Sequence, residues 1–190
     1  MTGFISPNHG DVLICDKSIT LNSIEVRKII GYLPENNPLY LDMYVKEYLL
    51  FIASIHLPKN QLKQRVKEIV ELTGLTVEQN KKIGALSKGY RQRTGLAQAL
   101  IHNPEVLILD EPTTGLDPNQ IVEIRNLIAK IGKEKTIILS THIMQEVEAI
   151  CDRIIIINNG LIVADEKPDT IHQKISEKTT VVVVDRKSVV

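Results

Sequence analysis

The sequence predicts an α/β fold in which helices cover a sheet with a parallel core. The fully apolar segment 106–109 and the segment 136–139, TIIL, flank residues 118–131, where isoleucines recur at helical spacing. Apolar strands that alternate with helices are typical of parallel sheets, whose strands are buried on both faces. A third observation extends the sheet, because Asn158-Asn159-Gly160 separates two further apolar segments. An Asn-Gly pair in that setting is a strong hairpin signal and predicts antiparallel strands after the parallel core.

The composition is that of an ordinary globular protein with balanced charge. Among 190 residues, Lys and Arg total 23 and Asp and Glu total 23, so no overall field attracts nucleic acid or anionic lipid. Cys15 and Cys151 lie far apart without a C-x-x-C pattern, which predicts two reduced thiols in the cytoplasm. No apolar segment approaches the ~18 residues that cross a bilayer. We therefore expect no nucleic-acid partner and no membrane-spanning segment.

Two short strands are predicted before residue 40. Residues 11–15, DVLIC, follow a Pro-Asn-His-Gly turn, and residues 29–33, IIGYL, end at Pro34. The opening residues MTGFIS are typical of the end of a helix, with Gly3 at its C-cap position.

Residues 41–101 form a predicted helical subdomain, inserted between two parts of the core, 1–40 and 102–175. Apolar residues recur there at helical spacing, and Gly74 ends the second of three helices. The remaining tail, 176–190, holds a run of valines that favours one more strand but leaves its structure open.

The apolar strand at 106–109 ends in two acids, Asp110 and Glu111. Side chains at the carboxyl end of a parallel strand project into the crevice where such folds bind ligands. Asp110 is placed to hold Mg²⁺, usually through a water, and Glu111 to orient an attacking water for phosphoryl transfer. Taken alone, the pattern also fits a core strand whose acids meet solvent or cap Thr113.

A second candidate site is the segment LSKGY, where Ser87 precedes a predicted helix. Free backbone N–H groups at a helix start carry about half a positive charge and bind phosphate. Gly89 allows close approach of the backbone to a ligand. Ordinary helix capping gives the same pattern, so this segment alone leaves both interpretations open.

The order of these motifs identifies a family resemblance. LSKGY, VLILDE, TTGLD and Thr141-His142 follow one another as in the ATP-binding subunits of ABC transporters, and the likeness covers about residues 1–175. It implies that LSKGY is the signature motif, VLILDE is Walker B and Gly115-Leu116-Asp117 is the D-loop. His142 is then the switch histidine that reaches the γ-phosphate of ATP. The run GYLPENNPLY is similar to ABC-2-type exporter subunits of the gliding-motility-associated branch.

The resemblance also implies ligands and partners. ATP and Mg²⁺ would bind between two subunits in a head-to-tail dimer, where Ser87 and Gly89 contact the ATP of the partner. Glu35 stands where the family has the Q-loop glutamine, and an ionised glutamate can ligand a cation but cannot donate a hydrogen bond. The signature departs from LSGGQ at Lys88 and Tyr90. A transmembrane subunit would provide the only membrane contact, at the inner face of the cell membrane.

The phosphate loop G-x-x-x-x-G-K-S/T, which the family resemblance leads us to expect, does not occur in the 190 residues. In the family that loop precedes a helix whose end is similar to MTGFIS. We therefore expect an N-terminal truncation that removes the first strands, Walker A and most of the first helix. Such a loss would leave an apolar sheet edge unpaired.

Three hypotheses follow. The chain is an energy-coupling ATPase subunit, or a fragment without hydrolysis that offers only a signature face, or a soluble ABC ATPase of the DNA-repair or translation-factor type. The lack of coiled-coil heptads and of a second cassette disfavours the third.

Overall fold

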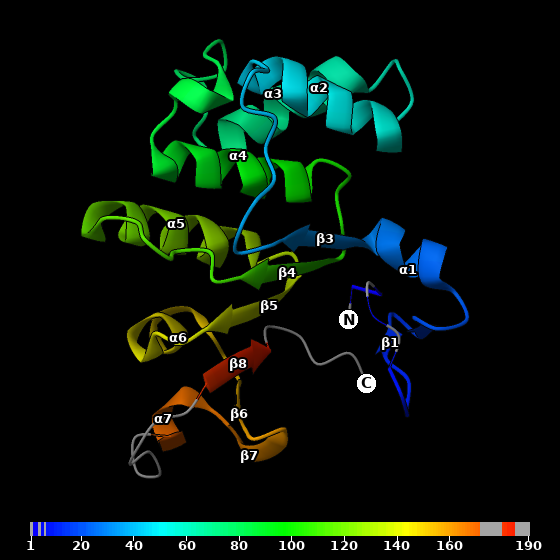
Figure 1. Ribbon diagram of the computed structural model, residues 1–190, viewed down its shortest axis with the longest axis vertical. Coiled ribbons are helices and arrows are strands. Elements are labelled where there is room, and N and C mark those ends of the chain that lie inside the picture. Colours follow the sequence, from blue (N-terminus) through cyan, green and yellow to red (C-terminus); the bar gives the residue numbers. More distant parts are fainter. Residues whose placement is uncertain (1, 4, 6, 172–179, 185–190) are drawn as a thin grey trace.

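A computed structural model describes the whole chain except residues 1, 4, 6, 172–179 and 185–190. Figure 1 shows helices α2, α3 and α4 gathered on one side of a sheet that begins with β3. The sheet has six strands in the order β3-β4-β5-β8-β6-β7, and a separate two-stranded hairpin lies near its first strand. No described helix is long and apolar enough to cross a membrane.

The predicted parallel core is confirmed in strands β3 (Ile30–Leu33), β4 (Val106–Asp110) and β5 (Thr136–Thr141). Their apolar side chains alternate between the two faces of the sheet, and Leu107 and Leu109 are fully buried. Because the strands run the same way in register, the last residues of β4 and β5 lie side by side at one edge of the sheet.

The remaining strands are antiparallel. The predicted hairpin is present as β6 (Ile154–Asn158) and β7 (Leu161–Glu166), and its turn residues Asn159 and Gly160 have φ of 49° and 78°. Strand β8 (Thr180–Val184) pairs antiparallel with both β5 and β6. The sequence analysis expected an unpaired apolar edge without naming a strand. In the described chain β5 and β6 both have β8 as a partner.

The N-terminal hairpin differs from the single strand predicted at 11–15. Strand β1 (Leu13–Ile14) is only two residues long, and β2 (Lys17–Ser18) returns beside it. The reason lies in the turn, where Cys15 and Asp16 have φ of 49° and 60° and reverse the chain. The short helix α1 (Ser23–Ile29), which the sequence analysis did not predict, then leads into β3.

Three helices fill the middle of the chain: α2 (Val45–His56), α3 (Leu62–Leu72) and α4 (Lys88–Leu100), with a 3₁₀ turn at Ile83–Ala85. Their apolar faces pack on one another and, through α4, on β3. Arg65 of α3 donates to the carbonyl oxygens of Leu100 and Ile101 at 2.8 and 2.9 Å. The guanidinium thus satisfies carbonyls that the end of α4 leaves without helical partners.

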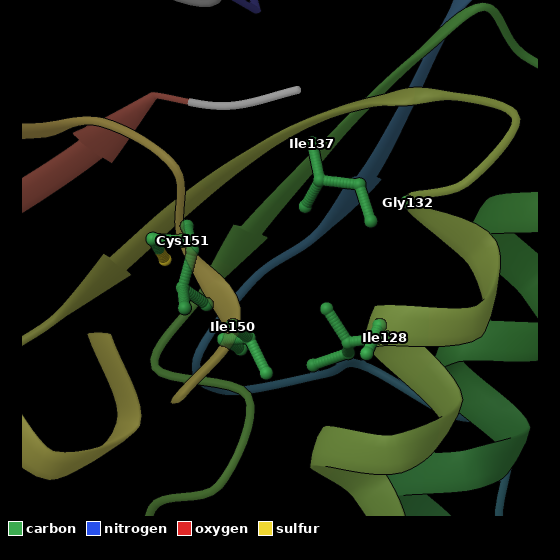
Figure 2. A pocket seen from close by; sticks show the side chains of 7 residues that line it. Ile128, Gly132, Ile137, Ile150 and Cys151 are labelled. Atoms are coloured by element: carbon green, nitrogen blue, oxygen red, sulfur yellow. The ribbon is translucent and has the colours of Figure 1, made fainter. Parts of the chain in front are cut away.

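Helices α5 (Pro118–Ile131), α6 (Met144–Ile150) and α7 (Pro168–Ile171) follow β4, β5 and β7. A small cavity of about 30 Å³ lies between α5, β5 and α6. Figure 2 shows Ile128, Ile137 and Ile150 among the side chains that line it. Its lining is largely apolar and includes none of the predicted site residues, so it is a gap in packing between layers.

Candidate functional site

Glu111 marks the point where the chain leaves β4. Its φ of 46° is a left-handed conformation that is unusual for a residue other than glycine. Its backbone N–H donates to the carbonyl oxygen of Ser140 on the neighbouring strand at 2.9 Å. The last ladder contact therefore holds Glu111 at the edge of the sheet while the chain turns away. Such local strain is concentrated at functional sites in proteins.

The Glu111 carboxylate meets His142, which follows β5. His142 Nδ1 lies 2.8 Å from Glu111 Oε1, and Thr114 Oγ1 donates to the other carboxylate oxygen at 3.1 Å. The hydrogen bond to Glu111, together with the charge of that carboxylate, raises the pKa of His142 above its ordinary value. The imidazole is 64% exposed, so its remaining nitrogen can reach a ligand.

Asp110 stands beside this pair at the end of β4. Ser140 Oγ donates to Asp110 Oδ1 at 2.9 Å. Burial, followed by the charge and hydrogen bond of Asp110, raises the pKa of Tyr32 on the adjacent strand β3. We call Asp110, Glu111 and His142 the strand-end cluster. Parallel strands in register explain why acids and a histidine some 30 residues apart in sequence meet here.

The strand-end cluster fits a magnesium ion that is held mostly by other ligands. Within the described residues, no three His, Cys, Asp or Glu side chains are grouped so that they could hold a metal. Mg²⁺ commonly binds through one or two carboxylates together with water and substrate phosphates. Asp110 is a hard oxygen ligand of the kind that such a site needs.

Three further predicted site residues, from the segments LSKGY and TTGLD, come together at the starts of two helices. Ser87 caps α4, with its Oγ 3.4 Å from the backbone nitrogen of Tyr90, and Asp117 caps α5 by accepting from Gln120 N at 3.0 Å. At Gly89 an added Cβ would lie 2.6 Å from Cδ of Gln120, so any larger residue would displace the end of that side chain. We call Ser87, Gly89 and Asp117 the helix-start junction.

Glu35 is exposed in the segment after β3. It lines an open cleft of about 480 Å³ together with Lys88, Arg91 and Gln92 of α4. Its charge is the weakest of several influences that raise the pKa of His142. Glu35 therefore lies within electrostatic range of the strand-end cluster without a direct hydrogen bond to it in the described chain.

The sequence analysis missed the hydroxyl and phenol groups around the strand-end cluster. Ser140 and Thr114 hold the two acids, Tyr32 lies beside Asp110, and Thr113 donates to the buried Glu146. The only signal in the sequence was a set of polar residues at the ends of apolar strands. That signal becomes specific only when the register of the strands is known.

The sequence of this chain is similar to those of known proteins. The ABC transporter family matches residues 1–114. The uncharacterized ABC transporter ATP-binding protein YhcH of Bacillus subtilis is 42% identical over 165 residues, which are 86% of this chain and 53% of that protein. The bacitracin transport ATP-binding protein BcrA of Bacillus licheniformis is 39% identical over 165 residues, 84% of this chain and 52% of that protein.

The fold has a counterpart among solved structures. CbiO1 of Clostridium perfringens, described as part of the ABC transporter complex CbiONQ, matches with a TM-score of 0.82 and 29% identity. The match covers 91% of this chain and 72% of CbiO1. The chain spans about half the length of YhcH and BcrA. The parallel sheet with its helices, the sequence matches and the shared fold together show that this chain belongs to the family of ABC transporter ATP-binding proteins.

Proposed function

We propose that this chain is the ATP-hydrolysing subunit that energises an ABC-2-like membrane exporter. The observation that carries the proposal is the pairing of Glu111 with His142, 2.8 Å apart, at the edge where β4 and β5 end beside Asp110. A carboxylate in contact with an imidazole can hold a water molecule and accept its proton. Phosphoryl transfer depends mainly on such positioning and electrostatics.

Each member of the strand-end cluster has a separate role in this proposal. Glu111 orients the attacking water and accepts its proton. His142 donates to the γ-phosphate, and its raised pKa favours the protonated, doubly donating imidazole. Asp110 holds Mg²⁺, and the ion supplies positive charge against the phosphates when it is bound. Glu35, at the position of the Q-loop glutamine, accepts hydrogen bonds or ligands the cation through oxygen.

The helix-start junction serves a second ATP in this proposal. Ser87 and Gly89 lie at the start of a 13-residue helix, whose free N–H groups favour an anion. In a head-to-tail dimer they would face the γ-phosphate of ATP held by the partner subunit. Asp117 lies on the same surface and would connect the two sites. Gly89 packs against the end of the Gln120 side chain and would allow the backbone to approach a phosphate closely.

We propose that the phosphate cradle of the working enzyme is supplied by residues outside these 190, since no phosphate-loop motif occurs among them. The cradle and its lysine hold the β- and γ-phosphates. We therefore expect negligible turnover from this chain alone. The second candidate function, a chain without hydrolysis that presents only the helix-start junction to a partner, rests on the same observation.

An apolar surface at the start of the helical subdomain, extending to the adjoining core residue Tyr40, is proposed to contact a transmembrane subunit. Its exposed side chains are Tyr40, Leu41, Tyr44, Phe51 and Ile55. The Tyr40 ring packs on Phe51, and the centroids of the two rings are 6.0 Å apart. Exposed aromatic groups of this kind mark sites of protein contact.

In this proposal the subunit is cytoplasmic and lies on the inner face of the membrane through its partner. Residues 41–101 form the helical subdomain, and 1–40 with 102–175 form the core. The proposed tail, 176–190, lies largely outside the described residues.

The similarity to the bacitracin transport protein BcrA supports a role in export, and the segment GYLPENNPLY supports the gliding-motility-associated branch.

The test is the ATPase rate of the protein extended upstream to include a phosphate loop, as wild type and as Glu111→Gln. We expect the substitution to lower the rate about 10²–10⁴-fold while ATP still binds. The matched control is Glu134→Gln, an exposed glutamate at the opposite end of the strands, which should leave the rate unchanged. Equal rates for wild type and Glu111→Gln would rule out the proposed role of the strand-end cluster.

A further inference from the structure

A buried carboxylate lies beneath the strand-end cluster and has no part in the mechanism above. Glu146, in the first turn of α6, is only 2% exposed. Its Oε2 accepts a hydrogen bond from Thr113 Oγ1 at 2.7 Å and lies 3.4 Å from Thr141 Oγ1. Its Oε1 is buried and has no hydrogen-bond partner among the described residues. No lysine or arginine of the described chain forms an ion pair with it.

A buried carboxylate such as that of Glu146 lowers the stability of the folded state. A buried carboxylate with two hydroxyl neighbours and no cation is less favourable than an apolar side chain of the same size. Thr113 and Thr141 are each 1% exposed, so all three polar side chains are withdrawn from water. An unsatisfied buried polar group in a native fold calls for an explanation. The positions of its neighbours provide one.

The two threonines belong to the two segments that carry the reacting pair. Thr113 lies two residues after Glu111, and Thr141 immediately precedes His142. Thr141 Oγ1 also accepts from the backbone N–H of Ile143 at 3.2 Å, which fixes the turn that presents His142. Glu146 therefore connects the segment after β4 with the end of β5 next to His142, near enough for its charge to raise the pKa of His142.

We propose that Glu146 is a positioning residue that holds Glu111 and His142 in contact by bridging Thr113 and Thr141. The inference rests on the proposed function of that pair. The bridge fixes Thr113, at the start of the segment that leads to Asp117. Glu146 touches neither the pair nor a substrate, and it acts only through its neighbours.

The test follows the imidazole of His142 by NMR in the 190-residue chain, with its signal assigned from His142→Gln. Glu111→Gln defines the full loss of the raised pKa that the pair produces. Thr113→Val, which deletes the bridging hydroxyl and keeps the volume, should lose most of the same shift. Thr113→Ser, which restores the hydroxyl, should regain it. Thr94→Val removes a buried hydroxyl that donates to Tyr90 O in α4, and it should leave His142 unchanged.

A second pair of variants separates positioning from charge, because the charge of Glu146 itself contributes to the raised pKa of His142. Glu146→Gln keeps an acceptor for Thr113 and should retain most of the shift, whereas Glu146→Leu should lose it. Equal losses for Gln and Leu, or an unchanged titration in Thr113→Val, would overturn the proposal. These outcomes do not depend on ATP turnover, so they are separate from a failure of the ATPase proposal.

Discussion

The strand-end cluster and the helix-start junction differ in what holds them together. Asp110, Glu111 and His142 are joined to their surroundings by side-chain hydrogen bonds, and one of these shifts the pKa of His142. The helix-start junction is held by backbone N–H groups that cap onto Ser87 and Asp117, and by a glycine that leaves no room for a Cβ. We expect the first region to respond to changes of charge and the second to changes of volume.

The largest effects should come from the core beneath each region. Leu109 of β4 and Leu96 of α4 are both fully buried, so replacement of either by alanine should lower the free energy of unfolding by about 2–5 kcal/mol. Urea unfolding measures this loss. Only Leu109→Ala should also change the titration of His142, because Leu109 precedes Asp110. A change of similar size in Leu96→Ala would show that the two regions are not independent.

A methyl group at Gly89 should disturb the helix-start junction next most strongly. The added Cβ would meet the Gln120 side chain, and overpacking of this kind costs about 1–3 kcal/mol. Because the clash is with the end of a flexible side chain, the double variant Gly89→Ala/Gln120→Ala should recover most of the lost stability. Thermal unfolding of both single variants and the double variant gives the coupling. Strict additivity of the two changes would contradict the close packing seen here.

Smaller effects are expected at the two caps. Loss of an N-cap side chain costs about 0.5–2 kcal/mol, and Asp117 caps at 3.0 Å whereas Ser87 caps at 3.4 Å. Asp117→Ala should therefore destabilise the protein more than Ser87→Ala does, while Asp117→Asn should be nearly neutral. Chemical unfolding at pH 7 ranks the three variants. The reverse order would mean that the Ser87 hydroxyl is committed to the helix and not available to a ligand.

The smallest effects depend on pH and have opposite signs in two histidines. Burial lowers the pKa of His102 below 6.5, so the unfolded chain binds more protons than the folded one as the pH falls below 6.5. Stability should fall over that range. The Glu111 carboxylate raises the pKa of His142 above 6.5, so its stabilising contribution is complete below pH 6.5. That contribution is lost as the pH rises through the folded-state pKa.

Unfolding measurements between pH 5 and 8 separate the two histidines. His102→Gln should reduce the loss of stability on the acidic side, where the neighbouring His56, whose pKa burial also lowers, contributes the remainder. His142→Gln should remove the decline on the alkaline side. His102 is held by a contact of its Nε2 with Ile30 O at 2.9 Å and by stacking on His56. An unchanged pH profile in His102→Gln would mean that its burial does not control its protonation.

Much of the fold was predictable because its signals are local. The apolar strands β4 and β5, the N-cap at Asp117 with Pro118 after it, and the Asn-Gly hairpin each depend on residues close together in sequence. The turn at Cys15 and Asp16 was not predictable, because cysteine is not typical of a left-handed conformation and an isolated aspartate is a weak signal for one. The pairing of β8 between β5 and β6 was equally hidden, since strand order depends on contacts between distant segments.

The candidate site also has features that the sequence predicts and features that only the structure shows. Asp110, Glu111, Ser87 and His142 became candidates from their motifs. Nothing in the motifs places Glu111 against His142 or Glu146 against Thr113. Threonine hydroxyls carry no pattern that distinguishes a bridge from an ordinary surface group. Their role appears only when the parallel register brings the ends of β4 and β5 together.

The sequence by itself determined the family resemblance, the alternation of strands and helices, and the residue types that phosphoryl chemistry needs. These depend on the order and local spacing of side chains along one chain. The tertiary structure alone decided which groups touch: the carboxylate with the imidazole, the glycine with Gln120, and the buried Glu146 with two threonines. The physical reason is that hydrogen bonds and close packing are short-ranged, so segments distant in sequence interact only once the sheet has set their register.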